Sequence, residues 1–387
     1  MNGSYVSGLA PVATDEEGEL VSVDRYQTYG FIGAYGTRKW RHSSLGLDYR
    51  GGYQYGNNRR APRGVNQALS LSYDHQMSRR VSISLGQSAG MSNRAYGFYH
   101  TGAAFGNELI GVPDDEIFDN RIYFSQSTAA AGYQFSARTA AAINGSFFLV
   151  RRKRGVLAGL NGYRASARMV HRLSFRDTIS GGYQFMNFHF PGLFGSSHIH
   201  GVQAEYQRML SPRLILSFLG GVYRSESLGR RTVTLDPEVA EILGQRTALE
   251  AAHNVNYLPQ GSVELAYLRQ FSRVNINYRR GVTPGNGLFL TSQRESINVG
   301  YSYSGIQKIS LGADVGYFRS TALFRERGRW NTVRGSIGAS YLIGRHVNLT
   351  TSLFARKFYL PNDLKRTSYG VTFGLAVSPI AVPLSIW

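Results

Sequence analysis

Charged side chains recur at alternate positions in segments whose remaining residues are small, polar or apolar. They share one side of each alternating pattern with glycine, serine and asparagine, and the other side is apolar. Groups of both signs on such a polar side suit an interior that holds water, where they polarise solvent and sort ions or brace the wall as ion pairs. Both roles stay open, and the excess of arginine favours anionic solutes. We therefore expect these residues to line an interior: Asp48, Arg50, Asp74, Arg164, Arg168, Glu205, Glu264, Arg279, Arg294, Asp314, Arg334 and Arg356.

Catalytic or metal chemistry finds weaker support. His189, His198 and His200 lie near one predicted loop, and the carboxylates at 114–116 lie in another. No nucleophile and base stand at a spacing that suggests catalysis. The His198-Ile199-His200 pair has no third ligand in the sequence, and no phosphate-binding glycine loop or dinucleotide fingerprint is present. We expect no catalytic residues, no metal and no cofactor, so the chain is predicted not to be an enzyme.

The element that would position the charged residues is a long β-strand. Apolar and polar residues alternate with period two through 296–303, 309–317, 333–341 and 369–377, among other segments. A sandwich of two sheets would need an apolar inner face from each sheet, whereas here the second face is polar along nearly the whole chain. The pattern predicts an all-β fold, a transmembrane antiparallel up-and-down β-barrel.

Composition agrees with such a barrel and narrows the alternatives. Apolar residues make up 42% of 387 residues, but mean hydropathy is −0.24, and no run reaches the roughly 18 apolar residues of a membrane-spanning helix. The chain has no cysteine, which excludes a disulfide framework. Its net charge of +19 comes almost entirely from arginine. These arginines are spread over strands and turns, which argues against nucleic-acid binding.

Two kinds of turn separate the predicted strands. Short turns rich in serine, glycine and basic residues alternate with longer connections, which is typical of bacterial barrels with short periplasmic turns and long external loops. The tracing finds seventeen strands in 23–387, beginning near 23–36. Because such barrels usually have an even number, we expect eighteen, with the missing strand in the N-terminal segment 1–22, near 3–9; sixteen is the alternative. Met1-Asn2-Gly3-Ser4 does not begin a signal peptide, so we expect a mature or trimmed chain, or a start further upstream.

One helix interrupts the longest predicted loop, 227–258. It carries Asp236 as a helix N-cap, proline at the first helical position, an early glutamate, and glycine at its end. If it folds inward, it makes a candidate constriction with the carboxylates Asp236, Glu238 and Glu241. The alternative is a short surface helix that stiffens an external loop.

The strand-and-turn repeat, the loop sequence Leu235-Asp236-Pro237-Glu238-Val239-Ala240 and the proline-rich aromatic ending at 375–387 together resemble porin-like outer-membrane β-barrel proteins of Gram-negative bacteria of the acidobacterial type. The resemblance covers most of the chain. It implies a cell outer-membrane location, insertion by the barrel-assembly machinery, and contact with outer-membrane lipid. Arginines at the outer rim would suit the phosphates of lipopolysaccharide head groups. The ending departs from the usual barrel terminus, because Pro379 and Pro383 cannot donate ladder hydrogen bonds.

Three functional hypotheses follow. The first is a porin-like channel with a net basic, water-filled lumen that passes small anionic solutes. The second is an export channel for an acidic polysaccharide. The third is a plugged barrel that serves as a surface enzyme or scaffold.

Overall fold

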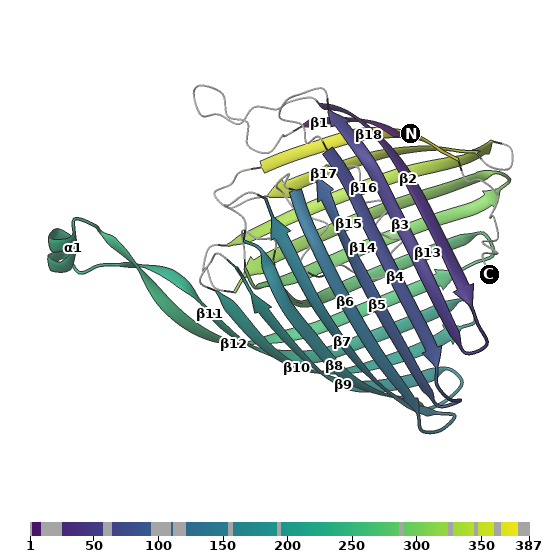
Figure 1. The fold of residues 1–387 in the computed structure, drawn as a ribbon, viewed down its shortest axis with the longest axis horizontal. Helices are drawn as coiled ribbons and strands as arrows, with labels where there is room; N and C mark the ends of the chain where they lie inside the picture. The colour runs from purple at the N-terminus through teal and green to yellow at the C-terminus, as the bar shows by residue number, and fades with distance from the viewer. Residues whose placement is uncertain are drawn as a thin grey trace.

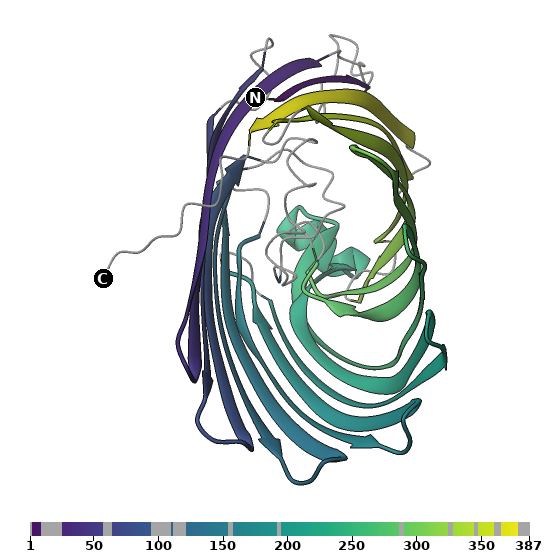
Figure 2. The ribbon, with the colours of Figure 1, turned by 90° about the vertical axis from the view of Figure 1, so that its right-hand side faces the viewer.

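The computed structural model describes residues 2–8, 25–56, 64–93, 110, 121–153, 158–191, 195–285, 290–323, 328–343, 347–359 and 365–377. Figure 1 shows one continuous wall of long strands, and Figure 2 shows that this wall curves round into an oval ring. Its elements are β1 (Asn2–Gly8), β2 (Arg25–Lys39), β3 (Ser43–Gly56), β4 (Gly64–Gln76), β5 (Val81–Asn93), β6 (Arg121–Gln134), β7 (Thr139–Arg152), β8 (Leu160–Arg172), β9 (Asp177–His189), β10 (Ser196–Ser211), β11 (Leu214–Thr234), α1 (Pro237–Leu243), β12 (Thr247–Leu268), β13 (Ser272–Thr283), β14 (Ser292–Ile306), β15 (Ile309–Ala322), β16 (Arg329–Ile343), β17 (Val347–Tyr359) and β18 (Lys365–Val377).

The described strands form one eighteen-stranded sheet in which sequence neighbours pair antiparallel. The short strand β1 closes the ring, because Tyr5 is the Cα partner of both Val371 in β18 and Tyr26 in β2. Closure gives the outermost strands partners and so removes exposed sheet edges. The expected count of eighteen strands is confirmed, and the strand missing from the sequence tracing is Asn2–Gly8.

The outward face of the ring is apolar and the inward face is polar over most of the wall. Ile337 in β16 and Leu353 in β17 are Cα partners, and they are 66% and 55% exposed. On the opposite face, Ser336 donates a hydrogen bond to the carboxylate of Asp314. Each square ångström of apolar surface left in water costs about 25 cal/mol. An exterior of this kind is therefore more stable in contact with lipid hydrocarbon than in contact with water.

Serine fixes the short turns at one rim of the ring. In the turn after β4, the Oγ of Ser78 accepts hydrogen bonds from the backbone N–H groups of Arg80 and Val81, at 3.2 and 3.1 Å. Ser136 and Ser174 do the same in the turns after β6 and β8. The hydroxyl satisfies backbone donors that the tight turn leaves without ladder partners. We name this rim the short-turn end and the opposite rim the long-connection end.

The segment 227–258, interpreted from the sequence as a loop, is strand over most of its length. β11 and β12 stay paired as far as Thr234 and Thr247, and α1 lies at the tip of this hairpin. Helix α1 has proline at its start and Gly244 as a left-handed C-cap with φ 62°. Figure 1 shows the hairpin projecting past the rim of the other strands. This part of the hairpin has no lipid to face, so its sequence lacks the apolar alternation that reveals the other strands.

Among the residues that the structure describes, none of the helical segments has the length and apolar character needed to cross a bilayer.

Candidate functional site

The charged residues that the sequence assigns to an interior all lie on inward strand faces. Each stands an odd number of positions from the exposed apolar residues in the middle of its own strand, such as Val202 for Glu205 and Ile297 for Arg294, so its side chain projects from the other face. They divide between two parts of the ring. The part from β3 to β12, named the mixed wall, carries Asp48, Arg50, Asp74, Arg164, Arg168, Glu205 and Glu264, and the part from β13 to β17, named the basic wall, carries Arg279, Arg294, Asp314, Arg334 and Arg356.

Charges of opposite sign are paired on the mixed wall. Asp48 accepts hydrogen bonds from Nε and Nη2 of Arg50, at 3.2 and 3.1 Å. Arg168 in β8 forms an ion pair with Glu205 in β10, and its Nε donates to the hydroxyl of Ser180 at 3.0 Å. The first contact lies within β3 and the second spans β9 to join β8 and β10, and both offset part of the local field.

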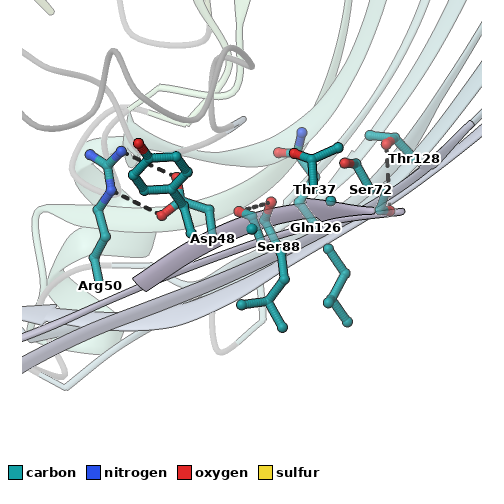
Figure 3. Close-up of a pocket in the computed structure, with 14 residues that line it drawn as sticks. Thr37, Asp48, Arg50, Ser72, Ser88, Gln126 and Thr128 are labelled. Atoms are coloured by element: carbon teal, nitrogen blue, oxygen red, sulfur yellow. Dashed lines mark hydrogen bonds and ion pairs between the residues drawn. The ribbon is translucent and has the colours of Figure 1, made fainter. Parts of the chain in front are cut away.

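A hollow of about 450 Å³ lies on the inward side of β2–β6, as Figure 3 shows. Hydroxyl and amide groups supply most of its polar lining, from Thr37, Ser70, Ser72, Ser88, Gln126 and Thr128, next to the Asp48–Arg50 pair. Ser70 and Ser88 face each other across β4 and β5 with their Oγ atoms 2.8 Å apart. Groups of this kind hydrogen-bond water and solute hydroxyls without adding charge.

The basic wall brings arginines together on aromatic rings. The guanidinium carbons of Arg294 and Arg334 lie 4.9 and 4.5 Å from the centroid of the Phe318 ring. Arg334 is the Cα partner of Arg356, whose guanidinium carbon lies 5.7 Å from the Phe358 centroid. Stacking on a ring orients a guanidinium and leaves its in-plane donors directed away from the ring. The structure thus gathers arginines from β14, β16 and β17 on one part of the lumen wall.

Sequence reasoning missed a second lumen feature, an apolar core at the long-connection end. Inward side chains from β6 to β11 pack there, and Phe148, Phe188 and Ile199 are at most 1% exposed. Where the sequence predicts a polar, water-filled interior throughout, this end is packed with apolar groups. The available signal was the run at 147–150, which is apolar on both faces. We name this the lumen cluster; it comprises Ile122, Phe148, Val150, Ala158, Leu160, Met186, Phe188, Phe190, Ile199, Tyr223 and Val282.

Burial follows a gradient along the inward faces. Towards the long-connection end, Trp330, Thr332 and Phe358 are at most 2% exposed. Towards the short-turn end, inward residues such as Asp74 and Glu264 are exposed. The lumen is therefore open towards the short turns and filled towards the long connections.

Several candidates from the sequence do not join this lumen. Asp236, Glu238 and Glu241 are exposed at the tip of the β11–β12 hairpin, beyond the ring, so the structure does not place them at a constriction. His198 and His200 share the outward face of β10, where their Nδ1 atoms contact Asn187 and the Tyr183 hydroxyl at 2.9 and 2.6 Å.

Within the described part of the chain, no three histidine, aspartate or glutamate side chains gather as a metal site would require. The carboxylates at 114–116 and the proline-rich ending at 378–387 lie outside the described residues.

Known structures that resemble this chain have low sequence identity to it. No model of a protein family and no curated protein matches the chain. The ferric citrate transporter FecA, in its unliganded form, is 10% identical with a TM-score of 0.48 over 96% of this chain and 63% of FecA. The copper transporter OprC is 12% identical with a TM-score of 0.47, over 97% and 64% of the two chains. OpdQ of Pseudomonas aeruginosa is 9% identical with a TM-score of 0.45, over 96% and 95%.

The chain spans less than two thirds of the length of FecA and of OprC. The fold assignment rests on the closed eighteen-stranded sheet and its exposed apolar exterior. These two features together are those of an outer-membrane β-barrel.

Proposed function

We propose that this protein is a porin-like outer-membrane channel that passes small anionic solutes along a lumen with one basic wall. The observation that carries the proposal is the unequal distribution of inward charge. Of the residues assigned to the lumen, four arginines lie on the basic wall with the one carboxylate of Asp314, whereas three arginines lie with four carboxylates on the mixed wall. A wall of one sign raises the local concentration of counter-ions in a narrow lumen.

The proposal includes the surroundings of the barrel. The apolar exterior is matched to bilayer hydrocarbon. Near the long-connection end, Arg280 and Arg319 share Glu295 as an ion-pair partner, and the net positive charge of this group suits phosphates of lipopolysaccharide. Insertion would depend on the barrel-assembly machinery, as for the proteins that the sequence resembles. Transport of this kind requires no cofactor and no catalytic group.

Reversal potentials test the anion preference. Single channels of the full chain are recorded in planar bilayers across a gradient of potassium chloride, and we expect a potential of the sign that chloride permeation gives. We expect the double substitution Arg334→Gln with Arg356→Gln to shift the reversal potential towards zero. The control is Arg151→Gln, which removes a positive charge at an exposed position on the outward face of β7 and should leave the reversal potential unchanged. A cation-selective wild-type channel contradicts the proposal.

A second candidate is an export channel for an acidic polysaccharide. The hydroxyl- and amide-rich hollow on β2–β6 favours it, because such groups hydrogen-bond sugar hydroxyls while the basic wall binds carboxylates. Adding uronic-acid oligosaccharides to the short-turn side during recording separates the candidates. Reversible block at low concentration supports the polysaccharide channel, and unchanged current supports the small-anion channel.

A further inference from the structure

Three polar side chains lie together on the outward face of β5 and β6, at mid-height of the wall. Gln87 is the central residue of β5, two positions from Leu85, which is 49% exposed on the same face. The amide nitrogen of Gln87 donates to the Oγ of Ser125 at 3.0 Å, and its carbonyl oxygen accepts a hydrogen bond from the hydroxyl of Ser127, its Cα partner in β6. We name Gln87, Ser125 and Ser127 the outward polar group. It lies at the depth where a barrel presents apolar side chains to lipid.

Hydrocarbon does not satisfy the outward polar group. An amide carries two N–H donors and a carbonyl acceptor, and a hydroxyl both donates and accepts. Among the described residues, the contacts of the Gln87 amide occupy one N–H and the carbonyl, which leaves the second N–H for a partner outside the chain. A donor that faces lipid without an acceptor costs free energy, because the bilayer core holds no water to replace it. Polar side chains at this depth therefore mark a surface that meets protein.

The strands beside the outward polar group carry small outward side chains. Ala129, Gly145 and Ala165 lie directly opposite one another across β6, β7 and β8. A Cβ added at Gly145 would meet nothing within 4 Å, so packing within this chain does not require a glycine there. On either side of Gly145 along β7, the outward side chains of Ile143 and Phe147 are 64% and 52% exposed. The face therefore has a low point between two projecting side chains.

The opposite side of the ring has a different exterior. β15 lies nine strands from β6 in either direction round the eighteen-stranded ring, and Figure 2 shows the two on opposite sides of the oval. On β15 and the two strands after it, Val315, Ile337 and Leu353 project outward and are 59%, 66% and 55% exposed. Large apolar side chains suit contact with lipid, whereas small side chains allow two backbones to approach closely. The outward polar group thus lies on the side of the ring that is shaped for close packing.

We propose that the outward face of β5–β8 is the contact surface for a second copy of this chain in the membrane. The surface is complementary to itself: an amide both donates and accepts, so the Gln87 amides of two copies pair across a twofold axis. Phe147 of one copy packs beside Gly145 of the other. Four strands about 4.8 Å apart and an apolar band about 25 Å tall give roughly 500 Å² per copy, which reaches the roughly 1,000 Å² total of a specific interface. The proposal goes beyond the proposed function, because it concerns the exterior and requires no particular solute.

Single cysteines test the contact, because the chain has none of its own. Ala129→Cys places a thiol beside the outward polar group without altering it. The matched control is Ala313→Cys, which replaces an outward alanine on β15, on the opposite side of the ring. Each full-length variant is oxidised with copper phenanthroline in phosphatidylcholine vesicles, and covalent dimers are measured on a denaturing gel without reductant. We expect about tenfold more dimer from Ala129→Cys, because a bound copy holds the two thiols at high effective concentration.

Removing the amide tests the polar part of the contact. Gln87→Leu leaves an apolar side chain that suits lipid, so the barrel is expected to fold while its association weakens about tenfold. Association is measured by energy transfer between donor-labelled and acceptor-labelled barrels in vesicles as the protein-to-lipid ratio is lowered. The control is Thr351→Val, which removes an outward hydroxyl from β17 and should leave the energy transfer unchanged.

Three results overturn the proposal. The first is equal covalent dimer from Ala129→Cys and Ala313→Cys, and the second is energy transfer that Gln87→Leu leaves unchanged. The third comes from oxidising Ala129→Cys in outer-membrane fragments of the expressing cells: a covalent product whose mass is not twice that of the chain shows that a different protein covers this surface. Neither experiment measures current, so the channel and the contact surface stand or fail separately.

Discussion

Arg334 and Arg356 lie directly opposite each other across β16 and β17, and both face the lumen. Like charges at opposite positions of an antiparallel pair destabilise a sheet by several tenths of a kcal/mol to about 1 kcal/mol. Their guanidinium groups stack on Phe318 and Phe358, which holds the two cations in place. Two guanidinium groups held side by side on the lumen wall suit an anion that passes along it.

Removing one member of this pair is expected to stabilise the barrel slightly. Arg334→Gln relieves the repulsion with Arg356, so we expect the free energy of unfolding to rise by up to about 0.5 kcal/mol while anion preference falls. Urea titration in lipid vesicles measures the first effect, and the reversal potential measures the second. A stability loss above about 1 kcal/mol would show instead that the arginine holds the wall together.

The Arg168–Glu205 pair is expected to have a small structural role. Both side chains are partly exposed, at 42% and 21%, so solvent screens the interaction. We expect a double-mutant cycle with Arg168→Ala and Glu205→Gln to give a coupling free energy of about 0.5–1 kcal/mol, lost at high salt. A coupling that salt leaves unchanged would indicate a pair shielded from lumen water.

The lumen cluster is expected to be a packed core. Phe188 is 1% exposed, and its ring centroid lies 5.9 Å from that of Phe148. Phe188→Ala should lower the free energy of unfolding by about 3–5 kcal/mol, because the cavity does not collapse fully. Phe218→Ala, on the outward face of β11 at 56% exposed, should cost much less, since lipid fills the space. Equal losses of the free energy of unfolding in the Phe188 and Phe218 variants would contradict a packed core inside the ring.

Neighbouring positions on β17 should respond oppositely to a charge. Leu353 faces outward near the middle of the strand, and Ser352 faces inward. Leu353→Arg is expected to cost about 2–4 kcal/mol, the value for arginine on the lipid side at mid-bilayer. Ser352→Arg should be tolerated and should raise anion preference. Unfolding titrations of the two variants in the same lipid compare their free energies of unfolding. Similar losses of this free energy in both variants would contradict a lipid-facing side and a lumen-facing side of β17.

Much of this architecture follows from the alternation of apolar and polar residues along the sequence. The alternation over 309–317 assigns Asp314 to one face and Val315 to the other, and the register with β16 agrees. Serine at the start of short turns marks the hairpins because its hydroxyl satisfies turn N–H groups, as at Ser78. These signals are local, which is why the strands, their order and the alternation of their two faces were accessible from sequence.

What the sequence did not reveal depends on contacts between distant residues. The Thr291–Ser197 contact joins positions 94 apart, and nothing local distinguishes either hydroxyl from others on the inward face. Phe148 lies in a run that is apolar on both faces, so alternation could not assign its ring to the lumen. Phe188 alternates with Asn187 and His189, and this local pattern alone favours an outward position for its ring, which in fact fills the lumen. The part of β11 and β12 that projects past the rim has the sequence of a loop, because a strand outside lipid needs no apolar face.

Thiol labelling along β17 can show whether one face of the strand meets water and the other meets lipid, because the native chain has no cysteine. Single cysteines replace consecutive residues from Thr350 to Arg356, and a membrane-impermeant charged thiol reagent is applied to the protein in lipid vesicles. We expect reaction at the inward positions 350, 352, 354 and 356 and protection at the lipid-facing positions 351, 353 and 355. Equal reaction at odd and even positions would contradict a barrel with a wet lumen and a lipid-facing exterior.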